Sequence, residues 1–286
     1  MNGFNGKIGH RHLGLWTVIV ENLNGGGRDG MTRGMYIATM GMLLDEARLN
    51  NVANNLANVD TTGYKKDRLA FRTYFDRFVY RIEPKPERGR NEVKRIGSLA
   101  MATILDEVRP DMAQGPTEYT GRKYDFAIDG EGFFKVGQGG NVYFTRNGHF
   151  IRDAMGRLTN SEGFFLLDEN DNVIVVPNGA EVADDGTVRA ADGTILARIP
   201  VYTFANPERL TKYGYTCFLP TQTSGAPVLV PQSRLLVGYL EKSNVNPVKE
   251  MVDMIYAQRH YDISQRLITT TDTLLERLIN DVGRTR

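Results

Sequence analysis

The stretch GMYIATMGMLLDEARLNNVANNLANVDTTGYKK, residues 34–66, decides the fold of this chain. Its apolar residues recur at alternating spacings of three and four, which is the period of a helix that buries one narrow stripe. The stripe consists of Met35, Ala38, Met42, Leu49, Val52, Leu56 and Val59, with Asp45 in one position. A second stripe of similar rhythm near the other end contains Val248, Met251, Ile255, Ile263, Leu267, Leu274, Leu278 and Val282. We therefore expect two long terminal helices that pair with each other in a coiled-coil-like bundle.

The C-terminal helix has a clear start in the sequence. Asn246 can serve as the N-cap, and Pro247 suits the first helical position. Glu250 lies in the first turn, where the helix dipole favours a carboxylate. The pattern then continues for roughly 35 residues, or about 50 Å at 1.5 Å per residue. A helix of this length needs a partner along its length, because its intrinsic propensity does not stabilise it.

Asparagines are concentrated in the N-terminal helix, at Asn50, Asn51, Asn54 and Asn55. Asn is disfavoured in a helix interior because its amide competes for backbone hydrogen bonds. One interpretation is that these amides lie at a packed interface, where they bond to neighbouring backbone and fix the register. The other is that they line a solvated face. Thr61-Thr62-Gly63 then supplies a natural helix stop.

The sequence between the helices is β in character. Gly130-Glu131-Gly132 separates two apolar runs, and Asn147-Gly148 between alternating runs is a strong hairpin signal. Further turns are expected at Gly156, Gly163, Gly186 and Gly193. Short strands at regular spacing with glycine turns indicate an antiparallel sheet or partial barrel. The predicted fold class is α+β, with long terminal helices and a central antiparallel β domain.

Four segments are expected along the chain. Residues 1–30 are a doubtful leader or a mis-assigned start, since a glycine-rich run without the Lys-Ser/Thr of a phosphate loop directly precedes Met31. We interpret this run as a translated ribosome-binding site. Residues 31–75 form the N-terminal helix and its connecting segment, residues 76–240 the central β-rich domain, and residues 241–286 the C-terminal helix. Pro84, Pro86 and the arginine-rich stretch from Arg88 to Arg95 indicate a solvated connection.

The composition is that of an ordinary globular protein. The formal net charge is +1, so composition gives no argument for binding nucleic acid or an anionic membrane. One cysteine, Cys217, excludes an intramolecular disulfide framework, and we expect it to be a buried thiol. No run of about 18 apolar residues occurs, so no transmembrane helix is predicted.

None of the candidate catalytic or metal-binding residues has the neighbouring residues in the sequence that such a site requires. Asp129 and Glu131 straddle a tight turn without a partner that could form a pocket. The stretch from Asp168 to Asn172 begins like a calcium loop, but Val173 stands where such a loop needs Gly. Ser224-Gly225 lacks the surroundings of a nucleophile elbow. Metal-ligand spacing is absent from the histidines His10, His12, His149 and His260, apart from the first two in the doubtful leader. We predict no catalytic residue, cofactor or metal site.

Several stretches resemble bacterial flagellar axial proteins. Ala53 to Val59 together with Thr62 to Lys65 resembles the N-terminal signature of rod, hook and hook-associated subunits. LEKSNVNPV (240–248), EMVDMI (250–255) and QRHYD (258–262) are similar to the closing helix of flagellar basal-body rod proteins. Residues 130–134, 145–148 and 202–207 resemble the central domain of rod and hook proteins. The resemblance thins between Phe75 and Ala113, and His260 replaces the usual Ala, which changes one local packing contact.

The resemblance to the flagellar basal-body rod family implies a structural subunit and not an enzyme. It implies an inner tube of paired terminal helices, an outer β domain, and head-to-tail self-association into a helical array that transmits torque from motor to hook. The implied partners are other rod subunits, hook-side axial proteins and the type III export apparatus. Export without a cleaved signal peptide would deliver the chain to the periplasm-spanning rod of the basal body.

The proximal rod (FlgF-like) is favoured over the distal rod (FlgG-like), because residues 75–113 fit the distal pattern less well. A hook or hook-associated subunit is an alternative, although its middle is usually longer. A periplasmic carbohydrate-cleaving rod-assembly enzyme is another, and it would need a carboxylate pair facing a groove. The expected assembly interface consists of Met42, Leu49, Val52, Asn54, Asn55, Leu56, Asn58, Val59, Met251, Ile255, Ile263, Leu267, Leu274 and Leu278.

Overall fold

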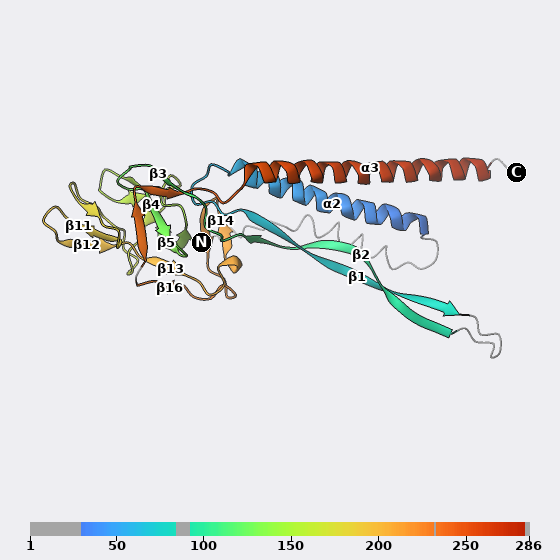
Figure 1. The fold of residues 1–286 in the computed structure, drawn as a ribbon, viewed down its shortest axis with the longest axis horizontal. Coiled ribbons are helices and arrows are strands. Elements are labelled where there is room, and N and C mark those ends of the chain that lie inside the picture. The colour runs from blue at the N-terminus through green and yellow to red at the C-terminus, as the bar shows by residue number, and fades with distance from the viewer. Residues whose placement is uncertain (1–29, 84–91, 232, 284–286) are drawn as a thin grey trace, which may run out of the picture.

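The computed structural model describes residues 30–83, 92–231 and 233–283 of the chain. A β domain lies at one end, and two long extensions project from it (Figure 1). One extension is a pair of helices, α2 (Gly30–Ala57) and α3 (Pro247–Gly283). The other is a two-stranded hairpin of β1 (Asp67–Glu83) and β2 (Glu92–Pro110). The α+β class, the paired terminal helices and the central antiparallel β domain are confirmed.

The two helices run antiparallel and contact each other along α2. Close to the β domain, Asn55 Nδ2 lies 3.4 Å from Glu250 Oε2. Farther out, a Cβ built on Gly41 would lie 3.6 Å from Ser264 Oγ. The same number of residues separates Gly41 from Asn55 in α2 as separates Glu250 from Ser264 in α3. One antiparallel register therefore holds between these two contacts. Since α3 has 37 residues and α2 has 28, α3 extends beyond the described start of α2 (Figure 1).

The ends of the helices follow local rules. Lys249 N donates to Asn246 Oδ1 at 3.1 Å, which confirms Asn246 as the N-cap before Pro247. α2 ends at Ala57, so Val59 lies outside the helix, contrary to the predicted stripe. At this end Asn58 N still donates to the Asn54 carbonyl at 3.2 Å, and the Asn58 side-chain amide shares that acceptor at 2.9 Å, whereas Val59 N donates to the Leu56 carbonyl, three residues back, and so leaves the helical pattern.

The hairpin β1–β2 corrects the expected layout around residue 90. Glu92 to Arg95 belong to β2 and pair with β1, where a solvated connection was expected. Residues 84–91 lie outside the described part of the chain. The expected boundary between residues 75 and 76 falls inside β1. A two-stranded ribbon outside the core has no face that must be apolar, so its strands need no hydrophobic alternation.

The β domain consists of short strands that pair antiparallel. They are β3 (Thr117–Tyr119), β4 (Phe126–Asp129), β5 (Phe133–Gln138), β6 (Asn141–Thr145), β7 (Ile151–Arg152), β8 (Leu158–Thr159), β9 (Phe165–Leu166), β10 (Glu181–Val182), β11 (Thr187–Arg189), β12 (Ile195–Arg198), β13 (Val201–Thr203), β14 (Thr211–Tyr213), β15 (Cys217–Leu219), β16 (Val228–Leu229), β17 (Arg234–Val237) and β18 (Tyr239–Glu241), with a 3-10 turn η1 at Pro207–Arg209. The main sheet follows the order β14-β15-β6-β5-β9-β8-β7, with β13 attached to β5 and β16 to β13. Three smaller groups complete the domain, namely β10-β11-β12, β17-β4 and β18-β3.

Four of the predicted turns are confirmed, and the hairpin predicted at Asn147-Gly148 is wrong. Gly156, Gly163, Gly186 and Gly193 all have φ between 80° and 84° and join consecutive paired strands. In contrast, β4 pairs with β17 and not with β5 across Gly130-Glu131-Gly132. β6 pairs with β5 and β15 and not with the strand after Asn147-Gly148. Gly148 is needed for close packing, since a Cβ there would lie 1.7 Å from the Phe126 carbonyl oxygen.

The core of the β domain is made by apolar residues from distant strands. Phe126, Phe134, Leu158, Leu166 and Leu235 are fully buried and belong to one cluster. Each Å² of apolar surface removed from water stabilises the fold by about 25 cal/mol. Such a cluster is therefore the main stabilising contribution to the β domain. Cys217 lies in the same cluster, so the predicted buried thiol is confirmed.

Candidate assembly site

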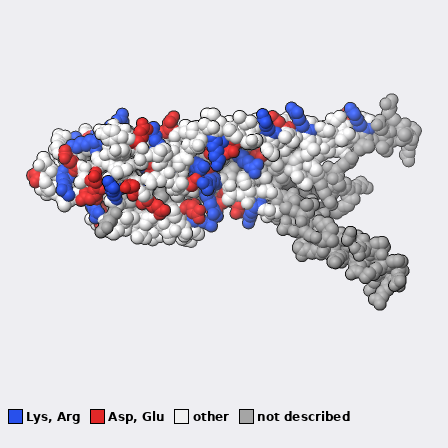
Figure 2. Space-filling model, in the orientation of Figure 1, with Lys and Arg blue, Asp and Glu red and all other residues white. Residues whose placement is uncertain are grey.

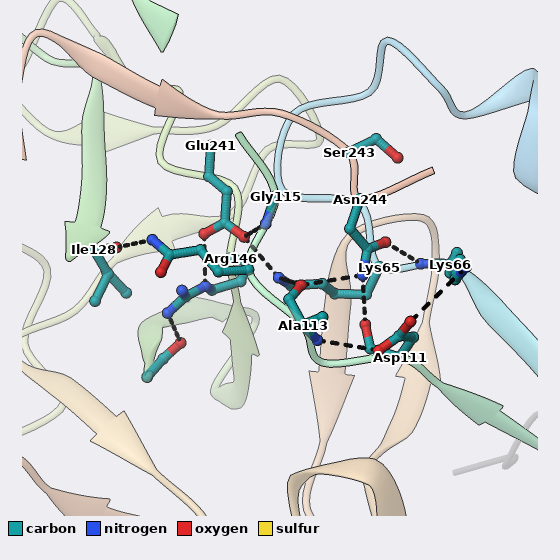
Figure 3. A network of polar contacts seen from close by, with 12 residues as sticks. Lys65, Lys66, Asp111, Ala113, Gly115, Ile128, Arg146, Glu241, Ser243 and Asn244 are labelled. Atoms are coloured by element: carbon teal, nitrogen blue, oxygen red, sulfur yellow. Dashed lines mark hydrogen bonds and ion pairs between the residues drawn. The ribbon is translucent and has the colours of Figure 1, made fainter. Parts of the chain in front are cut away.

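A buried cluster of three charged residues joins the helices to the β domain (Figure 3). Lys65 Nζ lies 2.6 Å from Glu241 Oε1, and Arg146 Nε donates to Glu241 Oε2 at 2.8 Å. The three side chains are between 1% and 4% exposed. Lys65 follows α2, Arg146 follows β6, and Glu241 ends β18 just before α3. We call Lys65, Arg146 and Glu241 the charge cluster.

Backbone groups complete the hydrogen bonding of the charge cluster. Lys65 donates to the Ala113 carbonyl at 2.7 Å, and Gly115 N donates to Glu241 at 3.0 Å. Arg146 donates to the carbonyls of Gly130 and Gly132, both at 2.5 Å. Burial lowers the pKa of Lys65 and of Arg146, while the Glu241 carboxylate opposes the shift in both. A buried ion pair is tolerated when its remaining donors and acceptors are satisfied in this way.

Asn244 ties the segment after α2 to the segment before α3. Its Oδ1 accepts from Lys66 N at 2.8 Å, and its Nδ2 donates to the carbonyls of Asp111 and Ala113 at 2.8 and 3.1 Å. Gly63 makes a similar link, because its N–H donates to the Glu241 carbonyl at 2.8 Å. Gly63 has φ +67°, and a Cβ there would lie 2.3 Å from Asn147 N. Glycine is therefore required for both its conformation and this close approach.

The charge cluster brings together three stretches that carry the family resemblance separately in the sequence. Lys65 lies in the N-terminal signature, Arg146 in the central one and Glu241 at the start of the C-terminal one. Sequence reasoning missed their contact. The position of each charged residue within one of the three motifs was the available signal, but it does not show which charged residues are buried together, since burial of a charge depends on its partner.

The asparagines of α2 divide between the two interpretations. Asn55 is 1% exposed and holds the backbone of β1, since its Nδ2 donates to the Asp67 carbonyl and its Oδ1 accepts from Asp67 N. Asn51 donates to the same carbonyl at 3.0 Å. The interface interpretation is therefore confirmed for Asn51 and Asn55. Asn50 and Asn54 are exposed, which matches the solvated face.

The face of α3 that contacts α2 is not the predicted stripe. A row of less exposed residues recurs every three or four positions, and we call it the inner row: Glu250, Met254, Ala257, Tyr261, Ser264, Ile268, Thr271 and Leu275. The predicted stripe stays open to solvent, with Met251, Ile255, Ile263, Leu267 and Leu274 between 50% and 64% exposed. The side chain of Leu278 lies outside the described part. The expected pairing of this stripe with α2 is therefore wrong.

On α2 the predicted residues are better covered. Val52 and Asn55 are buried, and Asn58 is 9% exposed. Met42, Leu49 and Leu56 are half-buried, as is Val59 beyond the helix, whereas Asn54 is exposed. Asp45, the polar member of the stripe, is 5% exposed and pairs with Arg48 at 3.0 Å. The N-terminal stripe thus contributes to packing within the chain.

The chemical candidates rejected on sequence have local structural roles. Asp129 lies 3.9 Å from Arg234 on the paired strand, and Glu131 is exposed. Asp168 to Asn172 forms a turn, as predicted, whose Asp171 carboxylate pairs with Lys135 at 2.5 Å. His149 Nδ1 lies 2.7 Å from Asp125 Oδ1. Within the described ranges, no group of three His, Cys, Asp or Glu side chains could hold a metal ion.

The charge distribution differs between the β domain and α3. Acidic and basic side chains are interspersed over the β domain, whereas the visible side of α3 is mostly uncharged between a few basic residues (Figure 2). The exposed residues of α3 include the apolar side chains of Ile255, Ile263 and Leu267, each more than half exposed. Neither described helix has an apolar stretch long enough to cross a bilayer.

Three family models match the chain in the regions that build this site. A model described as flagella basal body rod protein matches residues 35–65. A model described as flagellar hook protein FlgE/F/G D1 domain matches residues 127–196. A model described as flagellar basal body rod FlgEFG protein C-terminal matches residues 236–281. The first and last include Lys65 and Glu241, and the second includes Arg146.

Whole proteins are also similar over most of the chain. The flagellar basal-body rod protein FlgG of Bacillus subtilis (strain 168) is 31% identical over 264 residues, covering 87% of this chain and 99% of that protein. FlgG of Agrobacterium fabrum is 34% identical over 254 residues, covering 85% and 96%. The flagellar basal-body rod protein FlgF of Caulobacter vibrioides is 30% identical over 259 residues, covering 89% and 99%. Rod proteins of both names thus resemble this chain at similar identity.

Proposed function

Because this chain belongs to the flagellar basal-body rod protein family, we propose that it is a structural subunit of the bacterial flagellar rod that assembles with other flagellar components. The observation that carries this proposal is the long apolar surface of α3, which α2 leaves uncovered. Apolar residues on the solvent side of a helix offer surface whose burial against a partner is favourable. Neighbouring rod subunits supply that cover.

The proposed assembly is head-to-tail, with the terminal helices as a coiled-coil-like inner tube and the β domain outside. The inner row of α3 has the spacing of three and four that such pairing requires. The charge cluster fixes the helices to the β domain at one place, so force on the helices reaches the β domain through satisfied, buried contacts. This rigid connection suits a subunit that transmits torque from motor to hook. We propose no catalytic role.

The remaining partners and the location follow from family membership. We propose that the chain contacts other rod subunits and hook-side axial proteins in the periplasm-spanning rod. We also propose that the type III export apparatus delivers it without a cleaved signal peptide. The expected interface keeps its fourteen residues, with the exposed members on α3 facing other subunits.

The comparisons bear on the proximal and distal alternatives without separating them. FlgG is the distal rod protein, and its relatives reach 34% identity, against 30% for FlgF. The preference for the proximal rod rests on residues 75–113, most of which form the hairpin β1–β2. We therefore keep both positions as proposals within the rod, with a hook or hook-associated subunit as the alternative.

Deletion of the gene in the source bacterium tests the function. Purified basal bodies from the deletion strain should contain the export apparatus and a rod that stops where this subunit belongs, and a plasmid copy should restore full length. The point at which the rod stops distinguishes proximal from distal. A complete rod that lacks only its hook would support the hook alternative, and complete flagella would contradict the proposal.

A further inference from the structure

Two apolar patches lie on α3 at different distances from the β domain. We call Val248, Met251 and Ile255 the near patch, and their exposed fractions are 70%, 50% and 53%. We call Ile263, Leu267 and Leu274 the far patch, and their exposed fractions are 64%, 52% and 52%. Exposure of this size is common to all six, so α2 covers neither patch in the described structure.

The two patches lie on opposite flanks of the helix. Residues three and four apart share a face, so each flank can be followed outward from the β domain. Beyond the near patch, the same flank continues with the polar residues Gln258, Asp262, Gln265 and Thr269. The other flank begins with Asp253, Tyr256 and His260, which line a groove with Leu69 of β1. The far patch begins only beyond these three residues. One flank is therefore aliphatic close to the β domain, and the other is aliphatic farther from it.

This arrangement fits a second copy of the same chain. We propose that the near patch of one subunit packs against the far patch of the next, with the two α3 helices parallel, side by side and staggered. The centres of the patches are roughly 17 residues apart, so the stagger is about 25 Å at 1.5 Å per residue. The inference rests on the proposed function, because copies in a head-to-tail array all point the same way.

The pairing of unlike patches also explains how the array continues. When the near patch of one copy meets the far patch of another, each copy keeps one patch free for a further neighbour, and the contact repeats without closing. A near patch on a near patch would be a twofold contact and would end at a dimer. A polymer therefore needs two different, complementary surfaces, and α3 offers them.

Disulfide cross-linking of the full-length chain tests the stagger. Cys217 is buried, so introduced thiols on α3 are the reactive ones. The double variant Met251→Cys/Leu267→Cys, assembled and then oxidised, should convert most of the protein from monomer into a ladder of three or more linked subunits. After oxidation, each single variant should show no covalent link between subunits. The matched control Met251→Cys/Gln265→Cys should also form no covalent links. Gln265 is exposed and lies only two residues from Leu267 along α3, but on the opposite flank.

Sedimentation before oxidation separates the possible failures. Polymer without a covalent ladder would overturn the staggered contact and leave the rod function intact, whereas absence of polymer would count against the rod function itself. Dimers from Met251→Cys alone would show that near patches meet each other, which overturns the inference. Cross-linked bands that contain another basal-body protein, in place of multiples of this chain, would overturn the choice of a second copy.

Discussion

Lys65 Nζ and Glu241 Oε1 lie 2.6 Å apart inside the molecule, although 176 residues separate them in the chain. Lys65 belongs to the segment that leaves α2, and Glu241 to the strand that leads into α3. Arg146 approaches the same carboxylate from the β domain. The contact therefore connects three parts of the fold through one buried anion, and the helices cannot turn relative to the β domain without breaking it.

Removing the negative charge of this cluster should destabilise the fold strongly. Glu241→Gln keeps the shape of the side chain but leaves two buried cations without a counterion. Breaking a buried ion pair typically costs about 3–5 kcal/mol, and we expect a loss of that size in the free energy of unfolding, measured by urea denaturation. The control is Glu118→Gln, since Glu118 is 61% exposed and pairs with Lys242 at 3.0 Å. The control should stay within about 0.5 kcal/mol of wild type, and an equally small effect of Glu241→Gln would show that the cluster contributes little.

Adding one methyl group at Gly63 should have an effect opposite to that at Gly34. Gly63→Ala places a Cβ 2.3 Å from Asn147 N at a positive φ, so it should destabilise the chain by more than about 1 kcal/mol. Gly34 lies in α2 with nothing within 4 Å of its added Cβ, and Gly34→Ala should stabilise by about 0.5–1 kcal/mol. Thermal unfolding of both variants measures the difference. Equal melting temperatures would contradict the required close approach at Gly63.

A charge on the open side of α3 should prevent assembly without unfolding the subunit. Leu267 is 52% exposed, so Leu267→Asp should change the stability of the free subunit by no more than about 0.5 kcal/mol. In the array the same carboxylate would be buried unpaired at a cost of several kcal/mol per subunit. We expect loss of rod assembly and of motility, with the melting transition of the β domain within a few degrees of wild type. Ile195→Asp is the control, because Ile195 is 62% exposed on β12 and should leave motility unchanged.

Leu56→Asp should behave differently from Leu267→Asp. Leu56 is half-buried within the subunit, so its replacement should lower the stability of the helix pair in addition to blocking assembly. Circular dichroism of the purified variants separates the two effects. Motile cells carrying either variant would show that these positions are not interface residues.

The thiol of Cys217 should be inert in the folded protein. Burial raises its pKa to about 12, so the neutral form is favoured in the native state. A raised pKa contributes stability that is present below the ordinary thiol range near 9 and is lost as pH rises from there through the folded value. A thiol reagent at pH 8 should label Cys217 only in denaturant, and stability should fall above about pH 9. Cys217→Ala should remove that part of the fall, and rapid labelling of the native chain would contradict its burial.

Local signals in the sequence were sufficient for several elements. Asn246 and Pro247 predicted the start of α3, because N-capping depends only on neighbouring backbone groups. Gly156 and Gly186 predicted their turns for the same reason, since a positive φ is a property of the residue itself. Asn147-Gly148 misled, because Gly148 is small to admit the Phe126 carbonyl and not to form a hairpin.

The sequence by itself determined that two amphipathic terminal helices flank a β domain built on glycine turns. Only the tertiary structure decided which side of α3 meets α2. The inner row contains Glu250, Ser264 and Thr271, whereas the more apolar positions stay exposed on the two flanks of α3, so hydrophobicity alone selected the wrong positions. Glu250 can lie inside because Asn55 of α2 comes within hydrogen-bonding distance. The charge cluster obeys the same rule: whether a charged side chain can be buried depends on partners that folding brings to it, and residues distant in the chain supply those partners.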